Sequence, residues 1–493
     1  MLHRWFFLYC LAGLLVQGGE YYVSPTGRDS ASGTDPANAW RTVARVNQHL
    51  AQPGPAGGDF IRFCGGARFA GNLVVDRSTR GTAAQPTVLG TYGSGAATVL
   101  AGDGTGVLVR ESPWVCVSNL VLVAGRTNHG DGIRFDRIEN TGERLTGVRI
   151  ERCVTRGFGW HGIMIDAAAQ DRGFADVSVI DCDATENRHA GIMVYGGNPT
   201  GRTHRAHARV EVLRCRSWGN RGDPELLAYH SGSGIFLDGV EDGRVAACAA
   251  WRNGGECRNE RGGPVGIWLH ASRSTVIEGC ESFENRTLLR DGGGFDLDGG
   301  CERCVLRGNF AHDNDGPGIM VCSYTGAPYS DTDCVVEGNV SWNDGRRGSG
   351  YAGLHVSTEK GAHISNLLLV SNTIVAPPGA VSAVKIQGYQ IGGRFAANRV
   401  LASDHAVLVS VSGYDHRLGF TANQYWRGDG RAVFLVDYAW PVASVAAWTQ
   451  LAGRDGRFGE ITGERFEKVV IPALPKRGPS GRAKLLRQRV PPR

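Results

Sequence analysis

The sequence predicts an all-β fold, a single-stranded right-handed parallel β-helix solenoid with a short capping helix at each end. Three observations predict it. A strand pattern recurs every 25–34 residues, columns of identical residue types recur in phase with it, and 72 of the 493 residues are glycine without the triplet repeat of collagen. Glycine in this amount fits a chain that turns very often.

The first column is a Cys or Asn that follows each copy of a short strand. One copy reads Val-Arg-Ile-Glu-Arg-Cys at residues 148–153. The eleven positions of this column are Asn119, Cys153, Cys182, Cys215, Cys248, Cys280, Asn309, Asn339, Asn372, Asn398 and Asn423. Equivalent residues of adjacent coils lie ~4.8 Å apart, so we expect the Asn amides to hydrogen-bond from coil to coil. Crossovers between parallel strands are nearly always right-handed, which predicts the hand of the helix.

Other columns keep the same phase. Aromatic residues lie three positions beyond the first column, at Trp218, Trp251, Phe283, His312 and Trp342. Asparagines lie five positions beyond it, at Asn187, Asn220, Asn253, Asn285 and Asn314. A second strand in each coil begins with Gly and an apolar residue, at Gly132, Gly162, Gly191, Gly234, Gly266, Gly294, Gly318 and Gly353. Because all columns repeat together, we expect the coils to stack in register.

The two ends carry helical patterns that would cover the open ends of a solenoid. Apolar residues fall at helical spacing within residues 40–50 and again within 444–451. The expected organisation is a signal peptide at 1–19, a strand and capping helix at 20–60, the β-helix at 61–437, a C-terminal cap at 438–467 and a basic, disordered tail at 468–493.

The first residues predict export. His3 and Arg4 precede an unbroken apolar run at residues 5–16 and then small residues, which is the layout of a secretory signal peptide and is too short to span a bilayer. We therefore expect a secreted or periplasmic monomer without an integral membrane segment. The net charge is +5, but the tail contributes eight Lys or Arg and no acid, so the body is slightly acidic. Nucleic acid is not an expected partner.

The cysteines outside the signal peptide divide into two groups. Those of the first column are expected to be free and buried, because neighbouring coils orient them poorly for a disulfide. Cys301, Cys304, Cys322 and Cys334 are the better disulfide candidates in an exported protein. Zinc is not expected, because no second Cys pair or His completes a zinc-binding spacing.

The second strand carries the chemistry. If the apolar residue after each Gly faces the core, the residues two and four after Gly face outward. Three successive coils then present Phe236 with Asp238, Trp268 with His270, and Asp296 with Asp298. Carboxylate pairs hydrolyse glycosidic bonds, and exposed aromatic rings stack on sugars. The catalytic candidates are Asp238, Asp296, Asp298 and His270, and the substrate-binding candidates are Trp268, Phe236, Tyr195, His230, Tyr229 and His355.

Spacing and loops refine this site. Strand geometry places Asp296 and Asp298 ~6.5–7 Å apart, and Asp238 ~10 Å from Asp298, closer to the wide spacing of inverting hydrolysis than to the narrow one of retaining hydrolysis. Long segments at 221–233, 254–265, 286–293 and 344–352 precede these strands and would wall a groove.

Three other interpretations stay open. The Asp-Gly pairs at 238–239 and 298–299 could simply end strands. Asp291, Asp296 and Asp298 could bind calcium, although hydrolysis requires no cofactor. His312, with Asp313 and Asp315, is a weaker catalytic candidate.

Two segments carry a family resemblance. Residues 21–34 begin Tyr-Tyr-Val-Ser-Pro-Thr-Gly, and residues 292–300 read Gly-Gly-Gly-Phe-Asp-Leu-Asp-Gly-Gly. They resemble secreted bacterial right-handed parallel β-helix proteins, a superfamily that includes polysaccharide lyases, epimerases and glycoside hydrolases. The resemblance implies a carbohydrate-active enzyme with a polysaccharide substrate. Polygalacturonase-like members use three outward Asp, which Asp238, Asp296 and Asp298 match loosely.

The leading hypothesis is a secreted glycoside hydrolase. The first alternative is a polysaccharide lyase or uronate epimerase whose activity could depend on calcium. Some β-helix lyases use a Lys or Arg base, and because no lysine precedes Lys360, an Arg or His270 would have to serve. The second alternative is a non-catalytic carbohydrate-binding or surface β-helix.

Overall fold

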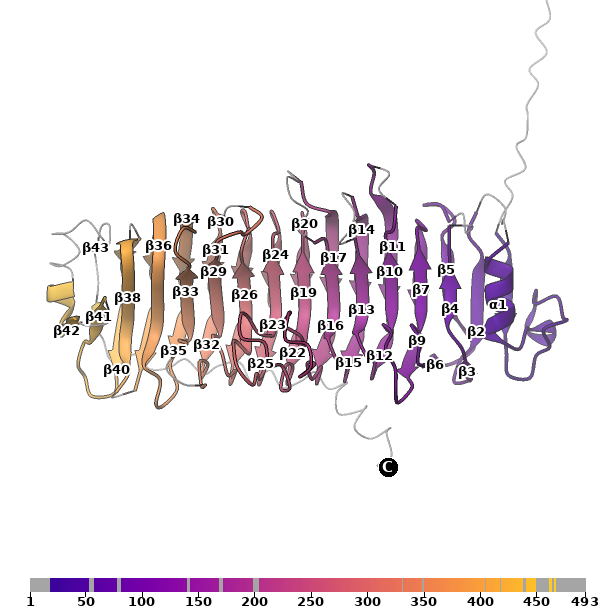
Figure 1. The fold of residues 1–493 in the computed structure, drawn as a ribbon, viewed down its shortest axis with the longest axis horizontal. Coiled ribbons are helices and arrows are strands. Elements are labelled where there is room, and N and C mark those ends of the chain that lie inside the picture. Colours follow the sequence, from indigo (N-terminus) through magenta and orange to yellow (C-terminus); the bar gives the residue numbers. More distant parts are fainter. Residues whose placement is uncertain are drawn as a thin grey trace, which may run out of the picture.

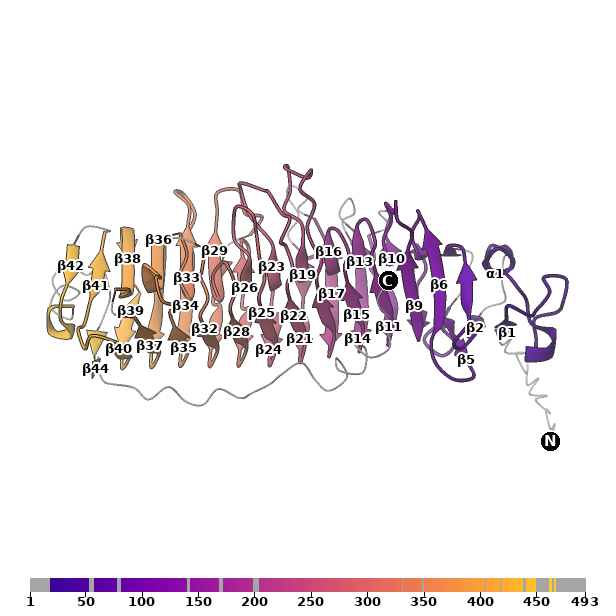
Figure 2. The same ribbon diagram turned by 90° about the horizontal axis from the view of Figure 1, so that it is seen from below.

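The computed structural model is an elongated parallel β-solenoid (Figures 1 and 2), and it describes residues 18–52, 57–77, 81–139, 142–167, 172–197, 204–329, 331–347, 350–403, 405–416, 418–437, 440–448, 461–462 and 465–466. The expected signal peptide falls almost wholly outside these residues, and the basic tail does so entirely. Within the described part, the helices are too short or too polar to span a bilayer. Each coil contributes up to three strands, so the solenoid has three faces.

The Gly face contains the strands that begin at the Gly column. These are β4 (Leu73–Val75), β7 (Val107–Arg110), β10 (Ile133–Asp136), β13 (His161–Asp166), β16 (Ala190–Tyr195), β19 (Ser233–Asp238), β23 (Val265–His270), β26 (Gly293–Asp298), β29 (Ile319–Ser323), β33 (Leu354–Thr358), part of β36 (Ser382–Ala396), β38 (Val407–His416) and β41 (Phe434–Val436).

The ladder face contains the strands that precede the Cys/Asn column. These are β1 (Glu20–Val23), β2 (Phe60–Cys64), β5 (Thr87–Tyr92), β8 (Val115–Ser118), β11 (Leu145–Glu151), β14 (Phe174–Ile180), β17 (His207–Leu213), β21 (Arg244–Ala246), β24 (Val276–Glu278), β27 (Val305–Arg307), β31 (Val335–Glu337), β34 (Ile364–Val370), the rest of β36, β39 (Gly419–Thr421) and β43 (Ile461–Thr462). Two short strands, β20 (Val240–Glu241) and β30 (Asp331–Thr332), also pair on this face.

The aromatic face is a third sheet made mainly of three-residue strands. These are β3 (Arg68–Ala70), β6 (Ala97–Gly102), β9 (Leu120–Ala124), β12 (Val154–Arg156), β15 (Asp183–Thr185), β18 (Arg216–Trp218), β22 (Ala249–Trp251), β25 (Glu281–Phe283), β28 (Phe310–His312), β32 (Val340–Trp342), β35 (Thr373–Val375), β37 (Arg399–Ala402), β40 (Gln424–Arg427) and β44 (Arg465–Phe466). The aromatic column stacks here, for example Trp218 on Trp251 with ring centroids 4.9 Å apart.

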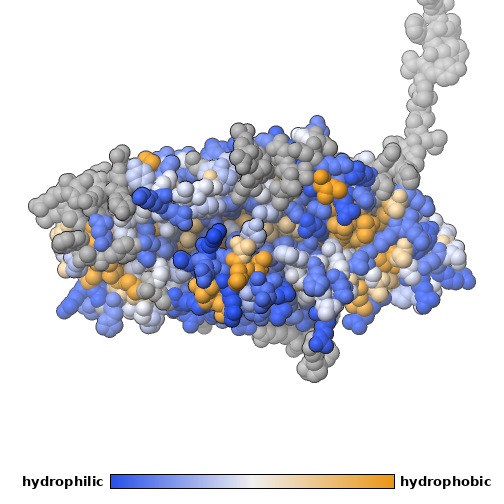
Figure 3. Space-filling view, in the orientation of Figure 1, coloured by the Kyte–Doolittle hydropathy of each residue, from blue (hydrophilic) through white to orange (hydrophobic). Residues whose placement is uncertain are grey.

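The in-register stacking expected from the columns is confirmed. Ile235 pairs with Ile267 and Ile267 with Phe295, so the apolar residue after each Gly lies above its equivalent in the next coil. These side chains are fully or almost fully buried and belong to one core that runs through the solenoid. The face seen in Figure 3 is mainly hydrophilic with apolar areas between, as expected when the apolar columns point inward.

The asparagine ladder is also confirmed. The amide nitrogen of Asn339 donates to the side-chain oxygen of Asn372 at 3.0 Å, and that of Asn372 donates to Asn398 at 3.1 Å. The expectation that this column starts at Asn119 is wrong by one residue. Leu120 pairs into the aromatic face and fills the buried slot, whereas Asn119 takes the left-handed conformation of the preceding turn, with φ of 56°.

The predicted disulfides are wrong, because each cysteine in the described part of the chain is a free thiol. Cys322 lies on the outward side of β29, whereas Cys301, Cys304 and Cys334 are buried in the core, so the sheet separates the first from the other three. The first-column cysteines are free and buried, as expected. Their thiols donate to backbone carbonyls, as Cys153 does to Val117 at 3.5 Å.

A short helix covers the front end. It is α1 (Val43–Leu50), which starts where the Thr42 hydroxyl accepts from the Arg45 amide and which buries Val43, Val46 and Leu50. A 3-10 turn, η1 (Pro36–Asn38), precedes it. At the back, β42 (Trp440–Val442) pairs antiparallel with β41, and residues 445–448 are helical. Trp448 is buried there and stacks on Phe434. Leu451 lies outside the described residues.

The second asparagine column ends on an acid. Asn285 donates to Asn314 at 2.9 Å, and Asn314 donates to Asp344 at 2.8 Å. Asp344 is buried, and that burial raises its pKa to about 7. The neutral form of Asp344 is therefore favoured at the position where the neighbouring coils have Asn.

Asp344→Asn is predicted to stabilise the protein above neutral pH. In an equivalent coil, the Asn220 amide donates to Ser217, which donates to the Gly234 carbonyl, and an amide at position 344 can repeat this arrangement with Ser341 and Gly353. Folding raises the pKa of Asp344 from 3.8 to about 7. The free energy of unfolding of the wild type therefore falls by up to ~4 kcal/mol as the pH rises from 3.8 to about 7.

Thermal unfolding of Asp344→Asn and wild type at pH 4 and pH 8 measures this effect. We expect little difference at pH 4 and a higher Tm for the variant at pH 8. Asp176→Asn, which removes only an exposed ion pair with Arg209, is the control. Equal Tm values for Asp344→Asn and wild type at both pH values would contradict the prediction.

Candidate functional site

The outward side of the Gly face gathers the predicted residues from separate coils. Asp238 pairs with His270 and His270 with Asp298, so these three lie in one row across β19, β23 and β26. Phe236, Trp268 and Asp296 form the neighbouring row. The alternation of inward and outward residues in the sequence therefore placed these side chains on the correct side of the sheet.

Asp238 and His270 form a fixed pair. Asp238 is fully buried, and its carboxylate accepts from the His270 Nδ1 at 2.6 Å and from the Gly197 amide at 2.8 Å. Burial opposes protonation of His270, but the hydrogen bond and charge of Asp238 outweigh it and raise the pKa of His270. Asp238 is enclosed and holds the His270 ring, whereas the sequence predicted a carboxylate open on the outside of the sheet.

The other ring nitrogen of His270 faces a residue that the sequence reasoning missed. Its Nε2 lies 2.6 Å from the Tyr324 hydroxyl, which follows β29. Since the carboxylate of Asp238 can only accept, Nδ1 carries a hydrogen, and the neutral ring then accepts from the Tyr324 hydroxyl. Tyr324 lies six residues after Gly318, so extending the outward alternation by one step would have found it.

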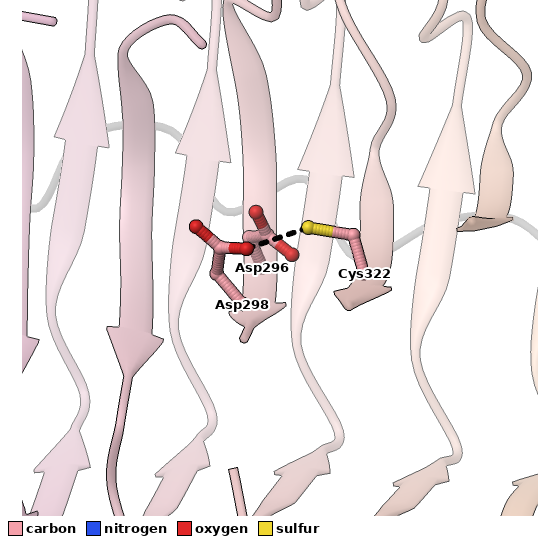
Figure 4. A group of neighbouring side chains, drawn as sticks. All are labelled: Asp296, Asp298 and Cys322. Atoms are coloured by element: carbon pink, nitrogen blue, oxygen red, sulfur yellow. Dashed lines mark hydrogen bonds between the residues drawn. The ribbon is translucent and has the colours of Figure 1, made fainter. Parts of the chain in front are cut away.

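Asp296 and Asp298 form the second part of the site together with Cys322 (Figure 4). Each of the three brings a carboxylate oxygen or thiol sulfur within 4.8 Å of those of the other two. The Asp298 carboxylate accepts from the Cys322 thiol at 2.6 Å and from the Gly299 amide at 2.8 Å. The side chains therefore converge more closely than the strand spacing of ~6.5–7 Å suggested.

Asp296 is the most perturbed acid of the site. It is 4% exposed, and its Oδ1 is buried without a hydrogen-bond partner among the described residues. Burial and the charges of Asp298 and Asp291 raise the pKa of Asp296 well above its ordinary value. The protonated form of Asp296 is therefore favoured more than that of an exposed aspartate.

Only two of the three residues predicted to bind calcium converge in the structure. Tyr351 donates to one oxygen of Asp291 at 2.7 Å, and the Gly263 amide donates to the other at 2.6 Å. The group that converges contains Cys322 in place of Asp291. Calcium takes six to eight oxygen ligands, whereas this group offers two carboxylates and a sulfur. Calcium binding stays a prediction that this donor set fits poorly.

Phe236 and Trp268 are not the exposed sugar-stacking rings that the sequence predicted. They are 5% and 3% exposed and stack on each other with centroids 3.6 Å apart. His230 covers them, with its ring 5.1 Å from that of Trp268, and burial lowers the pKa of His230 to about 4. The long 221–233 segment therefore brings His230 against the outward side of these two rings.

The remaining substrate-binding candidates lie at the margins. Tyr229 is 72% exposed on the same loop, and Tyr195 is half-buried beside Asp238, where burial raises its pKa to about 12. His355 lies two strands beyond Asp296, bonds Gln387 at 2.8 Å and has a pKa lowered to about 4 by burial. His312 belongs to the stacked column of the aromatic face, away from this site.

Comparisons with known proteins place the chain among right-handed β-helices. The family model described as "Right handed beta helix region" matches residues 131–340. No curated protein matches the sequence. The solenoid is a right-handed parallel β-helix. This confirms the predicted fold class and hand, and the matched residues include every catalytic candidate.

Solved structures share this fold at low identity. The A-module of the Azotobacter vinelandii mannuronan C-5 epimerase AlgE6 has a TM-score of 0.50 and 13% identity, over 87% of this chain and 96% of its own. The corresponding AlgE4 module has 0.47 and 12%, over 84% and 89%. A GH136 lacto-N-biosidase from Eubacterium ramulus has 0.40 and 15%, over 92% and 68%. At these identities the likeness concerns the fold alone.

Asp238→Asn is predicted to lower the pKa of His270 and to destabilise the protein most in acid. With its folded pKa raised, protonated His270 stabilises the fold fully below pH ~6.5, and this contribution is lost as pH rises through the folded pKa. Breaking a buried pair costs about 3–5 kcal/mol.

His270 titration by NMR, with unfolding at pH 5 and pH 9, measures both effects. We expect a lower His270 pKa and a larger loss of stability at pH 5. The same loss at both pH values, with an unchanged His270 titration, would show that Asp238 does not hold the ring. Asp176→Asn again serves as the control, because Asp176 lies on the ladder face.

Proposed function

We propose that this protein is a carbohydrate-active enzyme, and specifically a glycoside hydrolase that cleaves a polysaccharide. The observation that carries the proposal is the Asp296–Asp298 pair. One acid is buried with an unpartnered oxygen and a raised pKa, and the other, which has a carboxylate oxygen within 4.8 Å of the first, accepts two hydrogen bonds. Two carboxyl groups in such different environments suit an acid and its ionised partner.

Hydrolysis on this pair has a simple proton balance. Asp296 donates its proton to the leaving glycosidic oxygen while Asp298 attacks the anomeric carbon, and a water molecule then releases the sugar as Asp296 takes back a proton. The close approach of the two side chains favours this retaining route, for which carboxyl groups lie ~5–5.5 Å apart, over the inverting route expected from strand spacing.

A second candidate is a polysaccharide lyase or uronate epimerase, and the Tyr324–His270–Asp238 chain favours it. The Tyr324 hydroxyl can pass its proton to His270, whose charged form Asp238 stabilises. Burial and the charge of Asp298 raise the pKa of Tyr324, so the phenol would pass its proton to His270 only as its oxygen takes the proton from the carbon next to a uronate carboxylate. Calcium or another cation would neutralise that carboxylate in such an enzyme, as the sequence hypothesis allowed.

The proposal includes three further properties that were expected from the sequence. They are export, the monomeric state and the absence of a nucleic-acid partner. The signal-like residues 1–19 and the slightly acidic body support a secreted or periplasmic enzyme that meets its polymer outside the cytoplasm. The non-catalytic alternative, a carbohydrate-binding or surface β-helix, predicts binding without any product.

Asp296→Asn and Asp298→Asn are predicted to lower the rate of hydrolysis by ~10²–10⁴-fold each, which is the usual contribution of a positioned acid or base. New reducing ends are measured on a panel of polygalacturonate, alginate, xylan and β-glucan, with and without calcium. Asp176→Asn should hydrolyse at the wild-type rate. Wild-type activity in Asp296→Asn and Asp298→Asn would remove the pair from the mechanism.

Tyr324→Phe separates the two reactions. If the protein is a hydrolase, Tyr324→Phe keeps most of its activity, because the phenol only orients His270. A lyase would lose ~10²-fold or more and would produce ultraviolet absorbance from the unsaturated sugar in the wild type. An epimerase would change the polymer's uronate composition without new ends, which NMR of the polymer detects. Absence of every product would leave the binding alternative.

A further inference from the structure

Trp160 differs from the aromatic residues on the strands of the Gly face. It lies in the turn before β13 and is 43% exposed, whereas Phe236 and Trp268 are almost completely covered. Its amide donates to the Gly130 carbonyl at 3.0 Å, and its carbonyl accepts from the His189 amide at 2.9 Å. The exposed ring is therefore attached to the stacked coils and not to a long loop.

Two histidine rings support the Trp160 ring. His161 lies 5.9 Å away at 26° to its plane, and His189, from the next coil, lies 5.1 Å away. His161 is itself fixed, because Asp131 accepts from its amide at 3.0 Å and lies 2.7 Å from its Nδ1. Although burial opposes ionisation of Asp131, its bonds to His161 lower its pKa to about 2. The ring is thus held in a fixed position before any ligand binds.

Two polar atoms beneath this ring are left unsatisfied. The Nε2 of His161 and the Nδ1 of His189 are buried without a hydrogen-bond partner among the described residues. A buried polar atom without a partner is unfavourable, so such atoms often mark a place where water or a ligand completes the structure. A sugar offers an apolar face to the Trp160 ring, and its hydroxyl groups can reach these buried nitrogens only through a bridging water or a shift of the histidine rings.

Trp160 lies on the same face as the acid pair but is offset along the strands, because the register makes it equivalent to Gly292, four residues or ~13 Å before Asp296. From β13 the Gly face continues through β16, β19 and β23 to β26, which carries Asp296 and Asp298. Four rungs correspond to ~19 Å along the solenoid axis. Tyr229, the most exposed aromatic residue of the site, belongs to the segment before β19, halfway along this path. A single sugar cannot contact both Trp160 and the acids, but a chain of several sugars can.

We propose that Trp160, supported by His161 and His189, is a sugar-binding platform remote from the acid pair. The substrate is then a polysaccharide that crosses the Gly face obliquely to the solenoid axis and spans at least the rungs from β13 to β26. This inference rests on the proposed function for the position of the cleaved bond. It adds a binding residue that was not among the sequence candidates and requires a substrate several sugars long.

Affinity gel electrophoresis tests the platform independently of cleavage. Each variant is made in the Asp298→Asn background, which prevents degradation, and is run in gels containing polygalacturonate, alginate, xylan or β-glucan. We expect Trp160→Ala to bind the retained polymer about tenfold more weakly and Trp160→Phe, which keeps a ring, to bind nearly as Asp298→Asn alone does. Trp218→Ala, which removes a ring from the aromatic face, is the matched control and should bind unchanged.

Cleavage gives the second readout. With Asp298 intact, Trp160→Ala should lower kcat/KM on the polymer about tenfold and leave it unchanged on oligosaccharides too short to reach from β26 to β13. Undiminished binding and cleavage of the polymer by Trp160→Ala would overturn the platform and leave the hydrolase proposal standing. Trp160-dependent retention without any product would support the platform and overturn the hydrolase. Failure of all four polymers to be retained by any variant would overturn both.

Discussion

Hydrogen bonding between equivalent residues of neighbouring coils is the constraint on which the rest of this structure depends. Backbone groups of each strand pair with the strand above and below, and buried Asn amides extend the same pairing through the turns. A strand that slipped by one residue would turn its apolar side chains outward and break the ladder. The register is therefore fixed in every coil, and each column of the sequence becomes a straight row in space.

This register also creates the candidate site. Asp238, His270 and Asp298 are about thirty residues apart along the chain, yet they lie in one row because each is the fourth residue after its Gly. Asp296 and Asp298 come from one strand, and the next coil adds Cys322 beside them. The result is a site in which desolvation and neighbouring charge raise the pKa of Asp296 and in which Asp238 holds His270.

The fold was largely predictable because single residue types recur at the same position of successive coils. The Gly, Cys and Asn columns gave the hand, the register and the outward rows, and the error at Asn119 arose because Asn suits both the buried slot and the left-handed turn beside it. The site was predictable only in part. Sequence reasoning found Asp296, Asp298 and His270, but it took Phe236 and Trp268 for open surfaces and missed Trp160, because the path of a loop leaves no periodic signal. Tyr324 was also missed, although it lies one step beyond Cys322 in the outward alternation.

By itself, the sequence determined that this chain is a parallel solenoid and which residues face outward from each strand. The physical reason is that repeated burial and repeated hydrogen bonding act on short, local patterns. Only the tertiary structure decided which outward residues are covered, which carboxyl group lacks a partner and which ring reaches solvent. Those properties depend on loops from other coils folding over the sheet, as His230 folds over Trp268 and Tyr324 reaches His270. Distances and burial, which set the chemistry, are properties of that packing.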